Sequence, residues 1–178
     1  MQANAQPRWY VMRAYKAERK AEAALKQSAI DQYVPKIFAL RVYHGVKSRH
    51  LVPAIPSMVF VHACYDEILD FKRGSNFVQF VTRRKTDGGG PLVVPDRQME
   101  DFIKVTSQND AGAIYLKPEE INLQKGTPVR ILGGPMDGVE GVFLKIRGKR
   151  NRRVVVYLEG VSTAAAVEVN PDLIEVIK

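Results

Sequence analysis

Few residues in this sequence have the types and spacing that covalent or metal chemistry needs. His44, His50 and His62 lack a metal-ligand spacing such as His-Glu-x-x-His, and Cys64 is the only cysteine, so neither a zinc cluster nor an intrachain disulfide is expected. His62 precedes Cys64 by two residues, a spacing that any strand gives by chance. We predict that the protein is not an enzyme and that it holds neither a metal nor a cofactor.

Two glycine-rich stretches lie in this basic chain, where such stretches can cradle phosphate groups. The stretch "RILGGPMDGVEGVFLKI" (residues 130–146) runs from Gly133-Gly134 into Pro135, and the run at residues 88–90 likewise lacks the Gly-Lys-Ser/Thr ending of a phosphate-binding loop. We therefore interpret residues 130–146 as an architectural turn. Its glycines allow backbone conformations or close approaches that a Cβ hinders, and Pro135 presets one φ angle.

Cationic clusters are the remaining candidates for chemistry. The chain has 27 Lys and Arg against 19 Asp and Glu, a formal net charge of +8 that favours polyanionic partners. One cluster precedes the glycine run at 88–90, a denser one is "RGKRNRR" (147–153), and a weaker one comprises Lys47, Arg49 and His50. Each cluster fits either a nucleic-acid contact or a solvated surface. The candidate nucleic-acid contacts are Arg83, Arg84, Lys85, Arg147, Lys149, Arg150, Arg152 and Arg153.

The composition is that of a globular chain, long enough for one ordinary domain or two small ones. Hydrophobic residues make up 46% of the 178 residues and charged residues 26%. No apolar run approaches the roughly 20 residues that span a bilayer, and the start "MQANAQPRWY" lacks the basic and apolar regions of a signal peptide. We expect a cytoplasmic monomer with no membrane partner.

Hydrophobic periodicity predicts interleaved strands and helices over the first 106 residues. Ala17, Ala21 and Ala24 recur on one helix face and predict close packing on a sheet, and Glu22 stands four residues before Lys26 in the favourable order for an ion pair. The expected elements are strands at 8–15, 57–65 and 76–83, helices at 16–28, 66–73 and 94–106, and a loop at 86–91. Around His44-Gly45 the apolar alternation on both sides predicts a two-stranded hairpin or, alternatively, a mobile loop.

The remaining chain predicts a linker followed by an all-β domain. Residues 107–124 mix polar, Gly and Pro residues without a clear period, as linkers between domains do. Beyond them, "TPVRIL", "VEGVFLKI", "RRVVVYLE" and "AAAVEV" are strand-like runs whose spacing suits a small antiparallel barrel. The predicted organisation is a flexible tail at 1–7, a first domain at 8–106, a linker at 107–124 and a second domain at 125–178.

The segment "KGTPVRILGGPMDGVEGVFLKI" resembles the KOW motif, which ribosomal proteins and transcription factors share. The residues at the motif's turn glycines and core apolar positions are Gly126, Val129, Ile131, Gly134, Pro135, Gly138, Gly141 and Val142. The resemblance implies a small SH3-like barrel at 125–178. It also places Met136 at the tip of the turn, where family members present an apolar side chain to a protein partner.

The first domain resembles the N-terminal domain of NusG-type transcription elongation factors. The collinear matches are "WYVMRAY", "YVPKI", "PAIPSMVFV", "FVQFV" and "PLVVPDRQMEDFI", followed by the KOW segment, and they cover nearly the whole chain. Within this family, the sequences of these motifs are most similar to those of the UpxY-type antiterminators of capsular polysaccharide operons. General NusG factors usually carry Pro-Gly-Tyr where this chain has Pro56-Ser57-Met58. The resemblance implies an antiparallel sheet with flanking helices, joined to the KOW barrel.

The resemblance also implies the partners. An apolar surface of the first domain would bind the clamp helices of RNA polymerase, and the cluster before residue 88 would follow upstream or nontemplate DNA. The second domain would bind a ribosomal protein, another transcription factor or nucleic acid. The residues that the resemblance assigns to polymerase binding are Trp9, Tyr10, Arg13, Met58 and Phe60.

Two questions stay open from the sequence. Met58, Phe60 and His62 alternate with Val59, Val61 and Ala63, so one set belongs to the core and the other is partly exposed, but the pattern does not say which. The expected function is an operon-specific regulator that suppresses pausing or termination. The alternatives are a general NusG-type factor and a KOW-containing ribosomal or RNA-binding protein.

Overall fold

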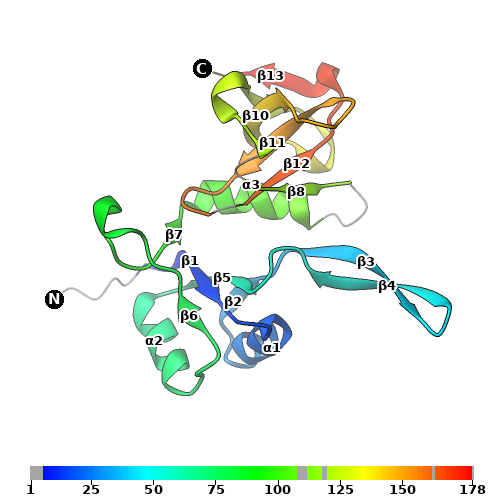
Figure 1. The fold of residues 1–178 in the computed structure, drawn as a ribbon. Coiled ribbons are helices and arrows are strands. Elements are labelled where there is room, and N and C mark those ends of the chain that lie inside the picture. Colours follow the sequence, from blue (N-terminus) through cyan, green and yellow to red (C-terminus); the bar gives the residue numbers. More distant parts are fainter. Residues whose placement is uncertain (1–5, 108–111, 118–119, 162, 178) are drawn as a thin grey trace. The chain divides into compact units, whose positions relative to one another are not determined.

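The computed structural model describes residues 6–107, 112–117, 120–161 and 163–177 (Figure 1). The chain divides into two compact units, Met1–Asp96 and Arg97–Lys178. The described residues form a mixed α/β structure with three α-helices and several antiparallel sheets, in agreement with the predicted α+β class. Residues 1–5 of the predicted tail, 108–111 and 118–119 of the predicted linker, and 162 and 178 of the predicted second domain lie outside the described residues.

A five-stranded antiparallel sheet organises the first unit. The predicted strand at 76–83 is reduced to two residues, because only Gln79 and Phe80 pair with the neighbouring strand, at Arg13 and Met12. The strand order is β2 (Asp31–Tyr33), β5 (Met58–Ala63), β1 (Arg8–Arg13) and β6 (Gln79–Phe80), and β7 (Val93–Val94) also pairs with β1.

Two helices, α1 (Glu18–Gln27) and α2 (Tyr65–Arg73), cover one face of this sheet (Figure 1). The core between them includes Ala21 and Leu25 from α1 and Ile68 from α2, each fully buried. The predicted helices and their close packing on a sheet are therefore confirmed. The predicted ion pair of Glu22 with Lys26 gives way to a longer-range one, since Glu22 lies 2.6 Å from Lys36.

A two-stranded hairpin, β3 (Lys36–Tyr43) and β4 (Val46–Pro53), extends away from this sheet (Figure 1). His44 and Gly45 form the turn, with φ angles of 46° and 79°. A two-residue turn with both central residues left-handed matches the natural twist of paired strands. The hairpin predicted from the sequence is confirmed, and we call residues 36–53 the arm.

The second unit contains α3 (Asp96–Thr106) apart from its first residue, together with a six-stranded antiparallel sheet. The four predicted strands are present, but the sheet does not close into the predicted barrel. Its end strands are three residues long and do not pair with each other in the described part of the chain. The sheet order is β13 (Ile174–Val176), β9 (Thr127–Ile131), β10 (Glu140–Lys145), β11 (Arg152–Tyr157), β12 (Ala164–Val167) and β8 (Ile114–Leu116).

The division of the chain at Asp96 differs from the predicted boundary at 107–124. The predicted helix at 94–106 exists as α3, but all of it except Asp96 belongs to the second unit. The predicted linker contributes β8, which pairs with β12, and the 3₁₀ helix η3 (Leu123–Lys125). A run as short as Ile114–Leu116 has too few alternating positions to be recognised as a strand from sequence.

Gly141, the second residue of β10, shows one reason why residues 130–146 need glycines. A Cβ on this residue would lie 2.6 Å from the carbonyl oxygen of Val155 and 2.8 Å from Cγ1 of Val154. Gly138, in the turn between β9 and β10, has a φ of 79°, which L side chains rarely adopt. The interpretation of residues 130–146 as an architectural turn is therefore confirmed.

Replacing Gly141 by alanine should destabilise the second unit, because the added methyl meets backbone that must move. We expect Gly141→Ala to lower the free energy of unfolding by about 1–3 kcal/mol in urea denaturation. Gly74→Ala is the matched control, since its Cβ would meet only the carbonyl oxygen of Phe71 at 3.8 Å. Equal stability of the two variants would contradict this account.

Candidate protein and nucleic-acid interfaces

The residues assigned to polymerase binding lie on the paired strands β1 and β5. Arg13 is opposite Met58, and Trp9 is opposite His62 with the ring centroids 4.9 Å apart. Directly paired residues share a sheet face, so Trp9, Arg13, Met58 and Phe60 belong to one face. We call this the display face. The alternate set, Val59, Val61 and Ala63, lies in the core under α1 and α2. The predicted division into a core set and a partly exposed set therefore holds for Met58 and His62 but not for Phe60, which is also fully buried.

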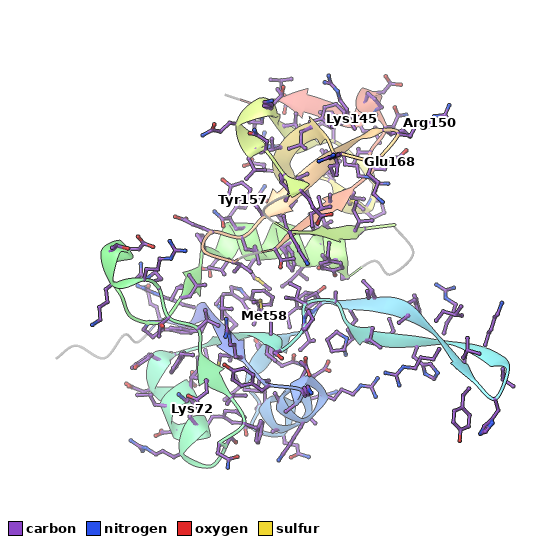
Figure 2. All side chains as sticks on the ribbon, in the orientation of Figure 1. Met58, Lys72, Lys145, Arg150, Tyr157 and Glu168 are labelled. Carbon is purple, nitrogen blue, oxygen red and sulfur yellow. The ribbon has the colours of Figure 1, made fainter. Side chains whose placement is uncertain are left out.

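The assigned residues differ in exposure. Arg13 is exposed and Trp9 is partly buried, as is Met58, whereas Phe60 is fully buried. Tyr10 was predicted to lie beside the polymerase-binding surface, but it is on the opposite face, 3% exposed and packed edge-on against Phe80. Burial raises the pKa of its hydroxyl. Tyr10 is thus a core residue. Arg13 is the exposed residue of the display face, and Trp9 and Met58 are partly accessible; Met58 is labelled in Figure 2.

The turn before β5 holds Met58 in a fixed backbone position. Ser57 has a φ of 59°, a left-handed conformation that costs a residue other than glycine about 1–2 kcal/mol. Its N–H donates to Oε1 of Glu18 at 2.5 Å, and its carbonyl accepts from the N–H of Ala14 at 2.9 Å. These bonds offset the strain at Ser57.

The arm presents apolar and cationic side chains together. It has no acidic residue over 36–53. Leu40, Val42, Tyr43 and Val46 are each between 60% and 74% exposed. The guanidinium of Arg49 lies 4.3 Å from the ring centroid of Phe38. The sequence indicated the cations of the hairpin but not this apolar exposure, although apolar residues on both faces of a two-stranded element were a signal for it.

An exposed loop of the first unit carries Arg83, Arg84 and Lys85. We call this loop, residues 83–90, the excursion. An isolated bridge between Thr82 and Pro91 closes the base of the excursion, and the N–H of Arg83 donates to the carbonyl of Gly90 at 2.9 Å. The backbone is therefore held at the base while the cationic side chains stay accessible. The cluster was predicted at the end of a strand that runs to Arg83, but β6 ends at Phe80, so the three cations lie beyond the strand.

The predicted cationic cluster of the second unit separates into two kinds of residue. Arg147, Lys149 and Arg150 are exposed on the connection between β10 and β11, and Arg152 begins β11. Arg153 instead has a side chain only 14% exposed, and its guanidinium lies 3.1 Å from the carboxylate of Glu168, the residue that follows β12. Arg153 therefore ties two neighbouring segments together, and the prediction that it is a nucleic-acid contact lacks structural support.

The turn that carries Met136 is bonded to α3 through its backbone. Met136 ends the 3₁₀ helix η4 (Gly134–Met136) and is partly buried. Lys104 donates to the carbonyl of Asp137 at 2.7 Å, and Arg97 donates to the carbonyl of Gly138 at 2.5 Å. The position of this turn thus depends on cations of α3.

Asp101 is the buried acid of the same contact region, 5% exposed. Its Oδ2 accepts from the N–H of Glu140 at 3.2 Å and lies 3.4 Å from the guanidinium of Arg97. Burial raises the pKa of Asp101, and the hydrogen bond from Glu140 and the charge of Arg97 only partly oppose this. Arg130 lies on β9, opposite Glu140 of β10. The hydrogen bond that its guanidinium donates to the carboxylate of Glu140 raises the pKa of Arg130.

An apolar pocket of about 430 Å³ lies within the second unit, between residues 121–124 and the turn from β11 to β12. Leu123 and Val161 contribute to its wall, and Tyr157 is 44% exposed. No pattern in the sequence indicates this pocket, because its two walls are far apart along the chain.

The described residues contain no cluster of three or more His, Cys, Asp or Glu that could hold a metal ion. Burial, followed by the charge of Glu67, raises the pKa of the Cys64 thiol, which disfavours the nucleophilic thiolate. Among the described helices, none has the length and apolar character to cross a membrane.

Comparison with known proteins gives no match, either to a family model or to a curated protein. The assignment of function therefore depends on the residues themselves and on their geometry.

Asp101 should make the stability of the second unit depend on pH. Its folded-state pKa lies above the ordinary value of 3.8, so its contribution is fully present below that value and is lost as pH rises through the raised pKa. Asp101→Asn keeps an acceptor for the N–H of Glu140 but removes the charge. We expect the variant to gain stability relative to the wild type between about pH 4 and pH 7 in urea denaturation.

The exposed Glu100 on the same helix supplies the control for this experiment. Glu100→Gln should leave the difference from the wild type nearly constant with pH. A constant difference for Asp101→Asn as well would show that burial does not shift this carboxyl.

Proposed function

We propose that the protein is a transcription elongation regulator of the NusG type that binds RNA polymerase and suppresses pausing or termination. It acts as an operon-specific antiterminator for polysaccharide biosynthesis genes. The collinear motifs of the sequence motivate this proposal. The single structural observation that supports it is the β1–β5 register, which places four of the five assigned residues, all except Tyr10, on one sheet face.

The display face has the chemistry of a protein-docking surface. Arg13 supplies an accessible cation, and Met58 beside it supplies a flexible apolar side chain that adapts to an irregular partner surface. Binding a helical pair of the polymerase would bury both. No bond is made or broken in such a function, so the factor acts by favouring the active state of polymerase over the paused state. A preference of about 1.4 kcal/mol changes that ratio tenfold.

The second unit completes the proposal as a KOW domain. Its β9, β10, β11 and β12 follow one another as antiparallel neighbours, and the turn between β9 and β10 has the glycines of the motif. A protein partner that contacts Met136 remains part of the proposal.

Charge reversal on the display face should abolish polymerase binding. We expect the double variant Arg13→Glu with Met58→Asp to weaken capture by immobilised core RNA polymerase by at least about tenfold, since both side chains lie at the centre of the proposed contact. Arg8→Glu is the matched control, because Arg8 is an exposed arginine at the other end of the same strand and on the opposite face. Equal binding by the double variant and the control would exclude this surface.

The cations of the excursion should affect a DNA-dependent step with little effect on polymerase affinity. We expect Arg84→Glu with Lys85→Glu to reduce suppression of pausing on a DNA template and to keep capture by polymerase. Lys26→Glu with Arg73→Glu makes the same charge change on α1 and α2 and should leave both activities unchanged. Pausing that is unaffected by the first pair would remove the DNA role.

The cationic connection between β10 and β11 favours a second candidate, a ribosomal or RNA-binding protein of the KOW class. Co-sedimentation with ribosomal subunits in the absence of transcription would support it. Binding to purified polymerase without ribosomes would favour the first proposal. Genome-wide occupancy at many genes rather than at one locus would identify a general NusG-type factor.

A further inference from the structure

A groove on the second unit combines an aromatic ring with several cations. It has a volume of about 600 Å³. It lies between the C-terminal end of β10, the N-terminal end of β11 and the segment that follows β12. Lys145 and Arg150 gather at the same end of this unit as Glu168 (Figure 2). The groove lies wholly within the second unit, so an inference from it does not depend on polymerase binding by the first.

The groove carries an excess of positive charge. Lys145, Arg150 and Arg152 line it, and none of the ion pairs between described residues includes them. Its one carboxylate, Glu168, is already engaged by Arg153 and by the amide of Asn151. The ammonium of Lys145 also donates one hydrogen bond to the carbonyl of Arg150, but it has three donors. The cations therefore keep donors for a polyanion, and Arg147 and Lys149 continue the charge beyond the groove along the connection.

The aromatic ring lies beside these cations. Phe143 and Lys145 share one face of β10, and Arg152 pairs directly opposite Lys145. The guanidinium of Arg152 lies over the partly exposed Phe143 ring, 5.9 Å from its centroid. A planar group that enters the groove thus meets an aromatic ring that a phosphate-binding cation already approaches from one face.

We propose that this groove binds a single-stranded nucleic acid, with one unpaired base stacked on Phe143 and the adjoining phosphates on Lys145, Arg150 and Arg152. A duplex keeps its base faces inside the stack and cannot offer one to a ring in a groove. An acidic peptide would use the cations but has no planar group for Phe143. Aromatic platforms beside a basic track are how proteins bind single strands without strong sequence preference.

Fluorescence anisotropy of the full-length protein with labelled 12-nucleotide strands tests the proposal. Phe143→Leu keeps an apolar side chain but removes the ring, and we expect it to weaken single-strand binding by about 5- to 150-fold. Phe143→Tyr keeps a ring and should retain binding. Tyr157→Leu removes another exposed ring of the same unit and should have no effect. RNA and DNA strands of matched sequence distinguish the two sources of the ligand.

The phosphate contacts have a separate readout. Arg152→Gln should reduce the slope of log affinity against log salt by roughly 0.7, the value for one lost contact with a single strand. Lys125→Gln, an exposed cation of the same unit outside the groove, should leave the slope unchanged. A bromouridine-substituted strand should crosslink to Phe143 under ultraviolet light, which locates the base even where the first unit also binds the strand.

Three outcomes would overturn the proposal. The first is a crosslink confined to residues outside 143–152. The second is a Phe143→Leu variant that is folded by circular dichroism and binds single strands as the wild type does. The third is equal or tighter binding of the matched duplex or of polyglutamate, which would identify a surface that recognises charge alone.

Discussion

The pairing of β1 with β5 is the interaction on which the first unit depends. Its register places Tyr10 opposite Val61 in the core and Trp9 opposite His62 on the display face. A slip of one residue would exchange these two faces, because alternate side chains of a strand point in opposite directions. The bonds that hold Ser57 to Ala14 and Glu18 lie at the end of this pair and so fix its register.

In the second unit, polar bonds from α3 add to an apolar core that includes Leu144, Ile146 and Val155. Gln98 accepts from the N–H of Glu159, Asp101 accepts from that of Glu140, and Lys104 donates to the carbonyl of Asp137. Side chains of one helix thus satisfy backbone groups at three separate places on the sheet and its turns. Such contacts are directional, so they define the position of the Met136 turn more narrowly than apolar packing alone would.

Local signals in the sequence were sufficient for the helices and for the hairpin, since periodicity and the His44-Gly45 turn act over a few residues. They did not show which residues lie on the display face. Phe60 and Val61 are equally apolar, and only the pairing of β1 with β5 assigns each of them to a face. Arg153 was misjudged for a related reason. Its partner Glu168 lies 15 residues away and becomes a neighbour only when β11 pairs with β12. The groove beside Phe143 depends on the same pairing.

The arm places side chains at a distance from the sheet of the first unit. A strand rises about 3.4 Å per residue, so an eight-residue strand carries its last side chain about 24 Å from its first. Tyr43 and Lys47 therefore stand well away from the sheet that bears Arg13. In the proposed complex with polymerase, the arm and the display face would contact the partner at two separated places. The affinity would then depend on the distance between those places as well as on the chemistry of each.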